Sequence, residues 1–138
     1  MSALTRIPVE SRWSRVRAPL LTIGGLGAAT LALHYRDPHV SGSWGFCPSA
    51  AMGFWCPGCG GLRAVNDLTH GEVVAAASSN LLLVVLVPVA VMGLLVWTRD
   101  RWRGTHTRVP AGAVWALVVA AGLFTLLRNT PAAPWLAP

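Results

Sequence analysis

The sequence predicts an all-α membrane protein with three transmembrane helices and a short interfacial amphipathic helix. Of the 138 residues, 54% are hydrophobic and only 12% are charged. A chain with this composition would expose a large apolar surface if it folded alone in water. Its apolar residues also gather into three runs of about 18 residues or more, which is the length that a helix needs to cross a bilayer.

The first span is expected at residues 18–35 and the second at residues 72–97. Pro88 lies in the middle of the second span and should kink it, because proline frees a backbone carbonyl one turn back. The third span, residues 110–127, begins with a proline at the helix start and ends before Arg128. The first run lacks a small-residue cleavage site, so we expect a retained helix rather than a signal peptide.

The arginines predict the orientation of these spans. The chain has a formal charge of +6 and contains arginine but no lysine. Arginine-rich short segments stay cytoplasmic, and the arginines gather in residues 1–17 and in the loop between the second and third spans. We therefore expect residues 1–17 to be a cytoplasmic basic tail and residues 18–138 to be one helical membrane domain. The loop at residues 36–71 and the C-terminus would then lie outside, and the basic charge would serve topology rather than nucleic-acid binding.

The motif Cys56-Pro57-Gly58-Cys59-Gly60 carries the most specific chemistry in the chain. Pro57 fixes the backbone after the first thiol, and Gly60 tolerates a left-handed conformation after the second. Such a turn resembles one half of a rubredoxin or zinc-ribbon site, for which zinc or iron is the expected ion. The candidate ligands are Cys47, Cys56, Cys59 and one histidine, with His70 preferred to His39 and His34.

Two other readings of the cysteines stay open. A structural disulfide between Cys47 and either Cys56 or Cys59 is the favoured one, without any bound metal. The third reading is a redox pair with a low-pKa thiol at Cys56, although Gly60-Gly61 should weaken a helix start after the motif. The sequence offers no paired carboxylates and no nucleophile with an obvious base, so it assigns no catalytic residue and does not favour an enzyme.

The residues after the motif predict the short amphipathic helix, because Leu62, Val65 and Leu68 share a helical face. Arg63 and Asp67 are spaced to pair on another face, and Arg63 is alternatively placed to hold a lipid phosphate or the carboxylate of a partner. Asn80, near the outer end of the second span, is expected to form an interhelical hydrogen bond or to meet water.

Small residues form a stripe on two of the spans and favour close helix packing within the protein. The stripes consist of Gly24, Ala28 and Ala32 on the first span, and of Gly112, Ala116 and Ala120 on the third.

The order of these motifs resembles a known family. Cys47-Pro48, the run from Gly53 to Ala64, Leu68 to Glu72 and Ala76 to Asn80 look like the bacterial membrane family of domain of unknown function 2752. The resemblance covers roughly residues 44–98. In this chain Leu62 replaces the family's threonine, Glu72 its aspartate, and Leu81 the proline after the asparagine. The resemblance implies a bacterial plasma-membrane location and a cysteine-bearing module, but it implies no reaction.

The favoured interpretation is a small accessory or structural subunit whose outward cysteine module binds a partner in the membrane. The partner is expected to be another membrane protein or a second copy of this chain, besides the lipid bilayer itself. The alternative is a metal-binding or thiol–disulfide redox membrane protein.

The orientation is testable with a reporter that works only outside the cytoplasm. It should be active when fused after Val40 or Pro138 and inactive when fused after Arg103, because of the arginine asymmetry. An active reporter after Arg103 would show that the orientation is the opposite of the predicted one.

Overall fold

The computed structural model describes residues 11–40, 44, 47–131 and 133–136, and the secondary structure in this part of the chain is helical, without strands. The elements are α1 (Arg12–Tyr35), α2 (Pro48–Ala51), α3 (Gly61–Thr69), α4 (Val73–Arg103), α5 (Ala111–Arg128) and the short 3₁₀ turn η1 (Pro134–Leu136). Helices α1, α4 and α5 are long and apolar enough to cross a membrane. The predicted fold class is therefore confirmed, including the short helix after the cysteine motif.

Helix α1 begins earlier than the predicted first span, at Arg12 rather than at residue 18. Ser11 caps it, because its side-chain oxygen accepts a hydrogen bond from the backbone N–H of Ser14 at 3.2 Å. Part of the basic tail is therefore helical and continuous with the span.

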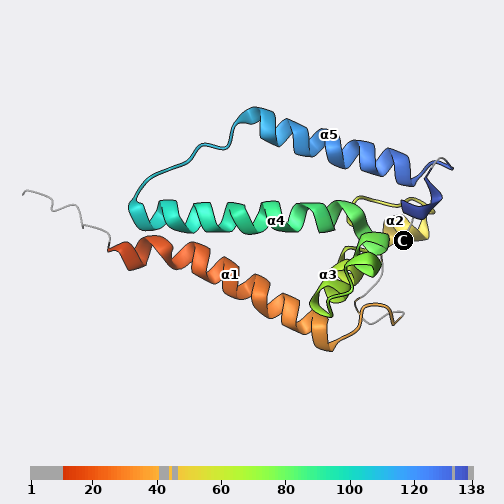
Figure 1. Cartoon of the computed structure of the whole chain (residues 1–138), viewed down its shortest axis with the longest axis horizontal. Helices are drawn as coiled ribbons and strands as arrows, with labels where there is room; N and C mark the ends of the chain where they lie inside the picture. The colour runs from red at the N-terminus through yellow and green to blue at the C-terminus, as the bar shows by residue number, and fades with distance from the viewer. Residues whose placement is uncertain (1–10, 41–43, 45–46, 132, 137–138) are drawn as a thin grey trace, which may run out of the picture.

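Helices α1 and α4 pack together, and the N-terminal end of α1 meets the C-terminal end of α4 (Figure 1). Trp13 and Trp102 contact each other edge to face at 5.5 Å, and Arg101 Nε donates to the carbonyl of Arg15 at 3.1 Å. The two arginine-rich segments thus lie at one end of the molecule. The cysteine segment lies at the other end, beside the C-terminal end of α5 (Figure 1).

Helix α4 is interrupted at Asn80, whose φ of −161° and ψ of 92° are not helical. Asn80 Oδ1 accepts a hydrogen bond from the N–H of Leu83 at 2.9 Å, as the first residue before a helix does. Asn80 therefore caps residues 81–103, which extend about 35 Å at about 1.5 Å per residue. The break at Asn80 was not predicted from the sequence. The backbone angles at Pro88 stay helical, and the predicted kink there stays a prediction.

Helix α3 packs against both α4 and α1, and the face that it buries against them includes polar side chains. A Cβ added to Gly61 would lie 3.3 Å from Leu83 Cδ1, so this glycine allows α3 to approach α4 closely. Asn66 and Asp67 are buried, whereas Leu62 is 47% exposed. The buried polar side chains have partners on the neighbouring helices, which lowers the cost of burying them. The predicted apolar face, which includes Leu62, is more exposed, and its contact with the membrane surface stays a prediction.

Helix α5 meets the rest of the chain near its C-terminal end. Phe124 clusters there with Ala133 and Leu136, packed against Leu81 and Leu82 of α4. The side chain of Asn129 accepts from the backbone N–H of Trp55 at 2.9 Å and donates to its carbonyl at 2.8 Å. The end of α5 is therefore joined to the cysteine segment.

The small-residue stripes do not bring the spans together as predicted. Among the described residues, no atom of another element lies within 4 Å of a Cβ placed on Gly24 or Gly112, and both glycines are exposed. The contact of α1 with α4 therefore uses other faces of these helices.

Replacing Asn80 by alanine should destabilise the protein by about 2–4 kcal/mol, because the change removes a helix cap and leaves buried polar backbone groups without their partner. Unfolding of the detergent-solubilised protein measures this loss. Ser78→Ala is the matched control, since Ser78 is exposed and bonds only to its own helix; its effect should stay within about 0.5 kcal/mol. Equal effects of the two variants would contradict the capping role.

Candidate metal centre

The cysteine segment consists of two similar Cys-Pro turns, one at Cys47-Pro48 and one at Cys56-Pro57. In each turn the backbone N–H groups two and three residues after the first cysteine face its sulfur. The second turn has Cys59 at its end, followed by Gly60 at a φ of 76°, where the chain reverses into α3. The helix begins directly at Gly61, so the expectation that the two glycines would weaken a helix start there is wrong.

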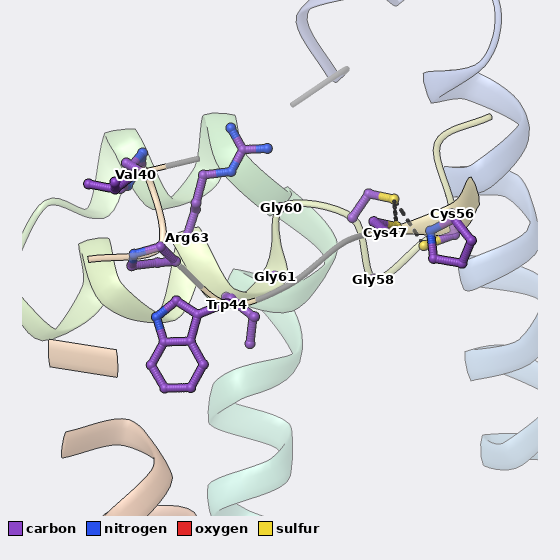
Figure 2. Close-up of a pocket in the computed structure, with 13 residues that line it drawn as sticks. Val40, Trp44, Cys47, Cys56, Gly58, Gly60, Gly61 and Arg63 are labelled. Carbon is purple, nitrogen blue, oxygen red and sulfur yellow. Dashed lines mark hydrogen bonds between the residues drawn. The ribbon is translucent and has the colours of Figure 1, made fainter. Parts of the chain in front are cut away.

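The two turns bring all three cysteines together, and Figure 2 shows Cys47 beside Cys56. The Sγ atoms of Cys56 and Cys59 lie 3.0 Å apart, and those of Cys47 and Cys59 lie 3.6 Å apart. All three Sγ atoms lie within 4.8 Å of one another, and we call this group the cysteine cluster. Cys47 is exposed, Cys56 is half-buried and Cys59 is buried. The three cysteines are free thiols in this structure, and the disulfide that the sequence favours stays a prediction.

Hydrogen bonds to sulfur favour thiolates at two of the three positions. The hydroxyl of Ser49 and then the N–H of Ala50 lower the pKa of Cys47 to about 7. The contact with the Cys59 thiol lowers the pKa of Cys56. Burial, followed by the contact with Cys56, raises the pKa of Cys59. The cluster thus presents one buried thiol between two sulfurs that ionise more readily.

Asn80 and Arg128 stabilise the second turn by donating hydrogen bonds to its backbone carbonyls. Asn80 Nδ2 donates to the carbonyls of Pro57 at 2.9 Å and Cys59 at 3.0 Å. Arg128 Nη1 donates to the carbonyls of Cys56 at 3.0 Å and Cys59 at 3.2 Å. The carbonyl of Cys59 therefore receives donors from both α4 and α5. From the sequence, Asn80 was expected near the outer end of the second span, whereas Arg128 was treated only as the charge that follows the third span.

A cavity of about 620 Å³ opens in front of the cluster. Figure 2 shows Cys47 and Cys56 at one side of it, with Arg63, Trp44 and Val40 at the other, and Gly60 and Gly61 between them. The predicted pairing of Arg63 with Asp67 is absent, because the ion pair among the described residues joins Asp67 to His39. The positively charged side chain of Arg63 therefore lines this cavity.

His70 is not brought to the cysteines. It follows the last residue of α3, which is about 13 Å long, whereas the cysteines precede its first residue. The ring of His70 stacks on that of His34 at 4.3 Å, and its Nδ1 lies 2.9 Å from the carbonyl of Asn66. The predicted histidine ligand is thus part of a separate polar cluster.

That polar cluster fixes α3 on its neighbours. Asn66 Nδ2 donates to the carbonyl of Leu33 in α1 at 2.7 Å. Asp67 contacts His39 Nε2 at 2.8 Å and accepts from Ser79 Oγ of α4 at 2.9 Å. Because α3 begins immediately after Cys59, these bonds also fix the direction in which the chain leaves the cysteine cluster.

The part of the chain that carries this arrangement matches the model of a known protein family. Residues 47–94 match the family model described as protein of unknown function (DUF2752). The DUF2752 region contains the cysteine cluster, α3 and most of α4, so the resemblance seen in the sequence is confirmed for this part of the chain. No curated protein and no solved structure matches the chain significantly. Arg128 lies outside the DUF2752 region although it binds the backbone of that region.

In the metal-free protein, Cys47 should be the fastest cysteine to alkylate, with a rate that falls as the pH drops through about 7. The thiolate is the reactive form, and the lowered pKa keeps it populated at neutral pH. Iodoacetamide labelling mapped by peptide mass spectrometry measures each cysteine separately.

Ser49→Ala should move the midpoint of the Cys47 rate to higher pH, since it removes the largest of the favourable hydrogen bonds. A midpoint that stays near 7 in this variant would contradict the assigned cause. Ser78→Ala, far from the sulfurs in sequence and hydrogen-bonded to Ala75, is the control.

Proposed function

We propose that this chain is a multi-pass membrane protein that binds one Zn²⁺ ion through Cys47, Cys56 and Cys59. The observation that carries this proposal is the convergence of three thiols from two separate turns within 4.8 Å. A disulfide or a redox pair needs only two sulfurs, and neither explains why the third is held in the same place by a turn of the same kind.

The donor set suits a soft divalent ion. Zinc binds thiolates at about 2.3 Å in a tetrahedron, which requires sulfurs about 3.8 Å apart. The 3.6 Å separation of the Cys47 and Cys59 sulfurs lies close to that value. The 3.0 Å separation of the Cys56 and Cys59 sulfurs is shorter, so these two thiols would move apart on binding the ion. The backbone N–H groups that face Cys47 and Cys56 are the donors that stabilise metal-bound thiolates. When bound, zinc would supply a Lewis acid with one coordination position not filled by cysteine.

The cavity in front of the cluster gives that remaining position access to a small ligand. Cys47, Cys56 and Cys59 all line it, as do Arg63 and His39. In our proposal the cluster lies on the extracytoplasmic side of the plasma membrane, since the arginine-rich segments gather at the opposite end. The role of accessory subunit for a membrane partner stays a prediction.

Thiol–disulfide exchange is the second candidate. It is favoured by the 3.0 Å separation of the Cys56 and Cys59 sulfurs, together with the lowered pKa of Cys56 and the raised pKa of Cys59. An exchange-active pair would have Cys56 as the attacking thiolate and the buried Cys59 as the resolving thiol.

The metal proposal predicts about one zinc per chain in protein purified without chelators, measured by elemental analysis that also counts iron. Cys47→Ser, Cys56→Ser and Cys59→Ser should each reduce zinc occupancy at least tenfold, because each removes one of three ligands. His70→Ala, at the far end of α3, is the control and should leave occupancy unchanged.

Thiol labelling separates the alternatives. In the zinc reading, alkylation is slow until a chelator is added, and all three cysteines then react. In the redox reading, Cys59→Ser traps mixed disulfides at Cys56 in a protein without stoichiometric metal. Loss of zinc in His70→Ala but not in Cys47→Ser would contradict the proposed ligand set.

A further inference from the structure

Arg128 is buried in an unusual way for an arginine. Its side chain is 2% exposed, and only Nη1 has hydrogen-bond partners, which are the carbonyls of Cys56 and Cys59. Nε and Nη2 are buried and have no hydrogen-bond partner among the described residues. The guanidinium also lies over the ring of Phe124, at 4.8 Å from its centroid. A buried charge with unfilled donors is costly unless an opposite charge compensates it.

No carboxylate provides that compensation within the part of the chain that the structure describes, where the ion pair is that of His39 with Asp67. The acidic groups beside Arg128 are instead the thiols of Cys56 and Cys59, the two residues whose backbone carbonyls bind its guanidinium. Hydrogen bonds to carbonyls alone do not require an arginine, because Asn80 makes equivalent bonds to the same turn without a charge.

We propose that Arg128 is the buried counter-charge of the metal centre and so fixes the charge state that the centre adopts. This inference rests on the proposed zinc site. A divalent ion bound by three thiolates has one net negative charge, which the single positive charge of Arg128 balances. Arg63 lies on the opposite side of the cavity (Figure 2), so the balance at the buried side of the centre favours a divalent ion whose fourth ligand is neutral, such as water or a neutral donor group.

Arg128 is thus a positioning residue with two separable effects on the centre. Its hydrogen bonds fix the carbonyls of the second turn, as those of Asn80 do. Its charge lowers the energy of the thiolate electrons, as a neutral side chain does not. Comparing variants of Arg128 and Asn80 separates charge from structure, since both side chains donate to the carbonyl of Cys59.

The test uses the full-length protein in detergent, with Zn²⁺ and Co²⁺ as the probes. Zinc affinity is measured by competition with a chelator, and the sulfur-to-cobalt charge-transfer band is measured by absorption. Arg128→Gln removes the charge but keeps a hydrogen-bond donor, whereas Arg128→Lys keeps the charge. Asn80→Ala weakens the turn without changing its charge.

Arg128→Gln should lower zinc affinity at least tenfold and move the cobalt band to lower energy, because the thiolate electrons lose the adjacent positive charge. Arg128→Lys should keep the band at the wild-type position. Asn80→Ala should lower affinity while leaving the band in place. If Arg128→Gln does not fold, Arg128→Met is the second neutral variant, with the same expected band shift.

Two results would overturn the inference, and they are distinguishable. A wild-type protein that binds neither Zn²⁺ nor Co²⁺ stoichiometrically removes the metal proposal and this inference together. A wild-type protein that binds both ions, with neutral Arg128 variants showing an unshifted band, retains the zinc site but removes Arg128 as its counter-charge.

Discussion

The carbonyl of Cys59 is the point on which the arrangement of this end of the molecule depends. It accepts hydrogen bonds from Asn80 of α4 and from Arg128 of α5, two helices that are otherwise joined there through η1 and a small apolar cluster. A turn of three or four residues has no core of its own, so its shape must be imposed from outside. Here the amide of Asn80 and the guanidinium of Arg128 impose the shape of the turn, and both side chains are buried.

The same contact explains why helix α4 is broken. An asparagine within a continuous helix would have its side chain directed along the helix surface, and its own N–H would be used in the ladder. By leaving helical geometry, Asn80 caps the membrane-spanning part of α4 and directs its amide toward the second Cys-Pro turn. Stability and site geometry therefore depend on one side chain.

Sequence reasoning identified the spans because hydropathy over about 20 residues depends little on tertiary contacts. It also identified the short helix and the DUF2752 resemblance. It missed that Cys47 begins a second Cys-Pro turn, because Pro48-Ser49-Ala50 lacks the glycines and the second cysteine that mark such turns. It chose His70 as a ligand by loop length, whereas a rigid helix separates His70 from the cysteines. Arg128 was missed because the contact spans 72 residues, which local patterns do not encode.

The long separation between Arg128 and its partners has a consequence for biosynthesis. The ribosome completes the cysteine turns, α3 and α4 before it makes the arginine that stabilises them. Until α5 has been inserted and its C-terminal end has reached the turn, the carbonyls of Cys56 and Cys59 lack one of their donors. The nascent protein therefore passes through a stage with two inserted spans and an incompletely ordered trio of thiols. Oxidation or capture of the wrong ion has its best opportunity in that interval, before the last helix is in place.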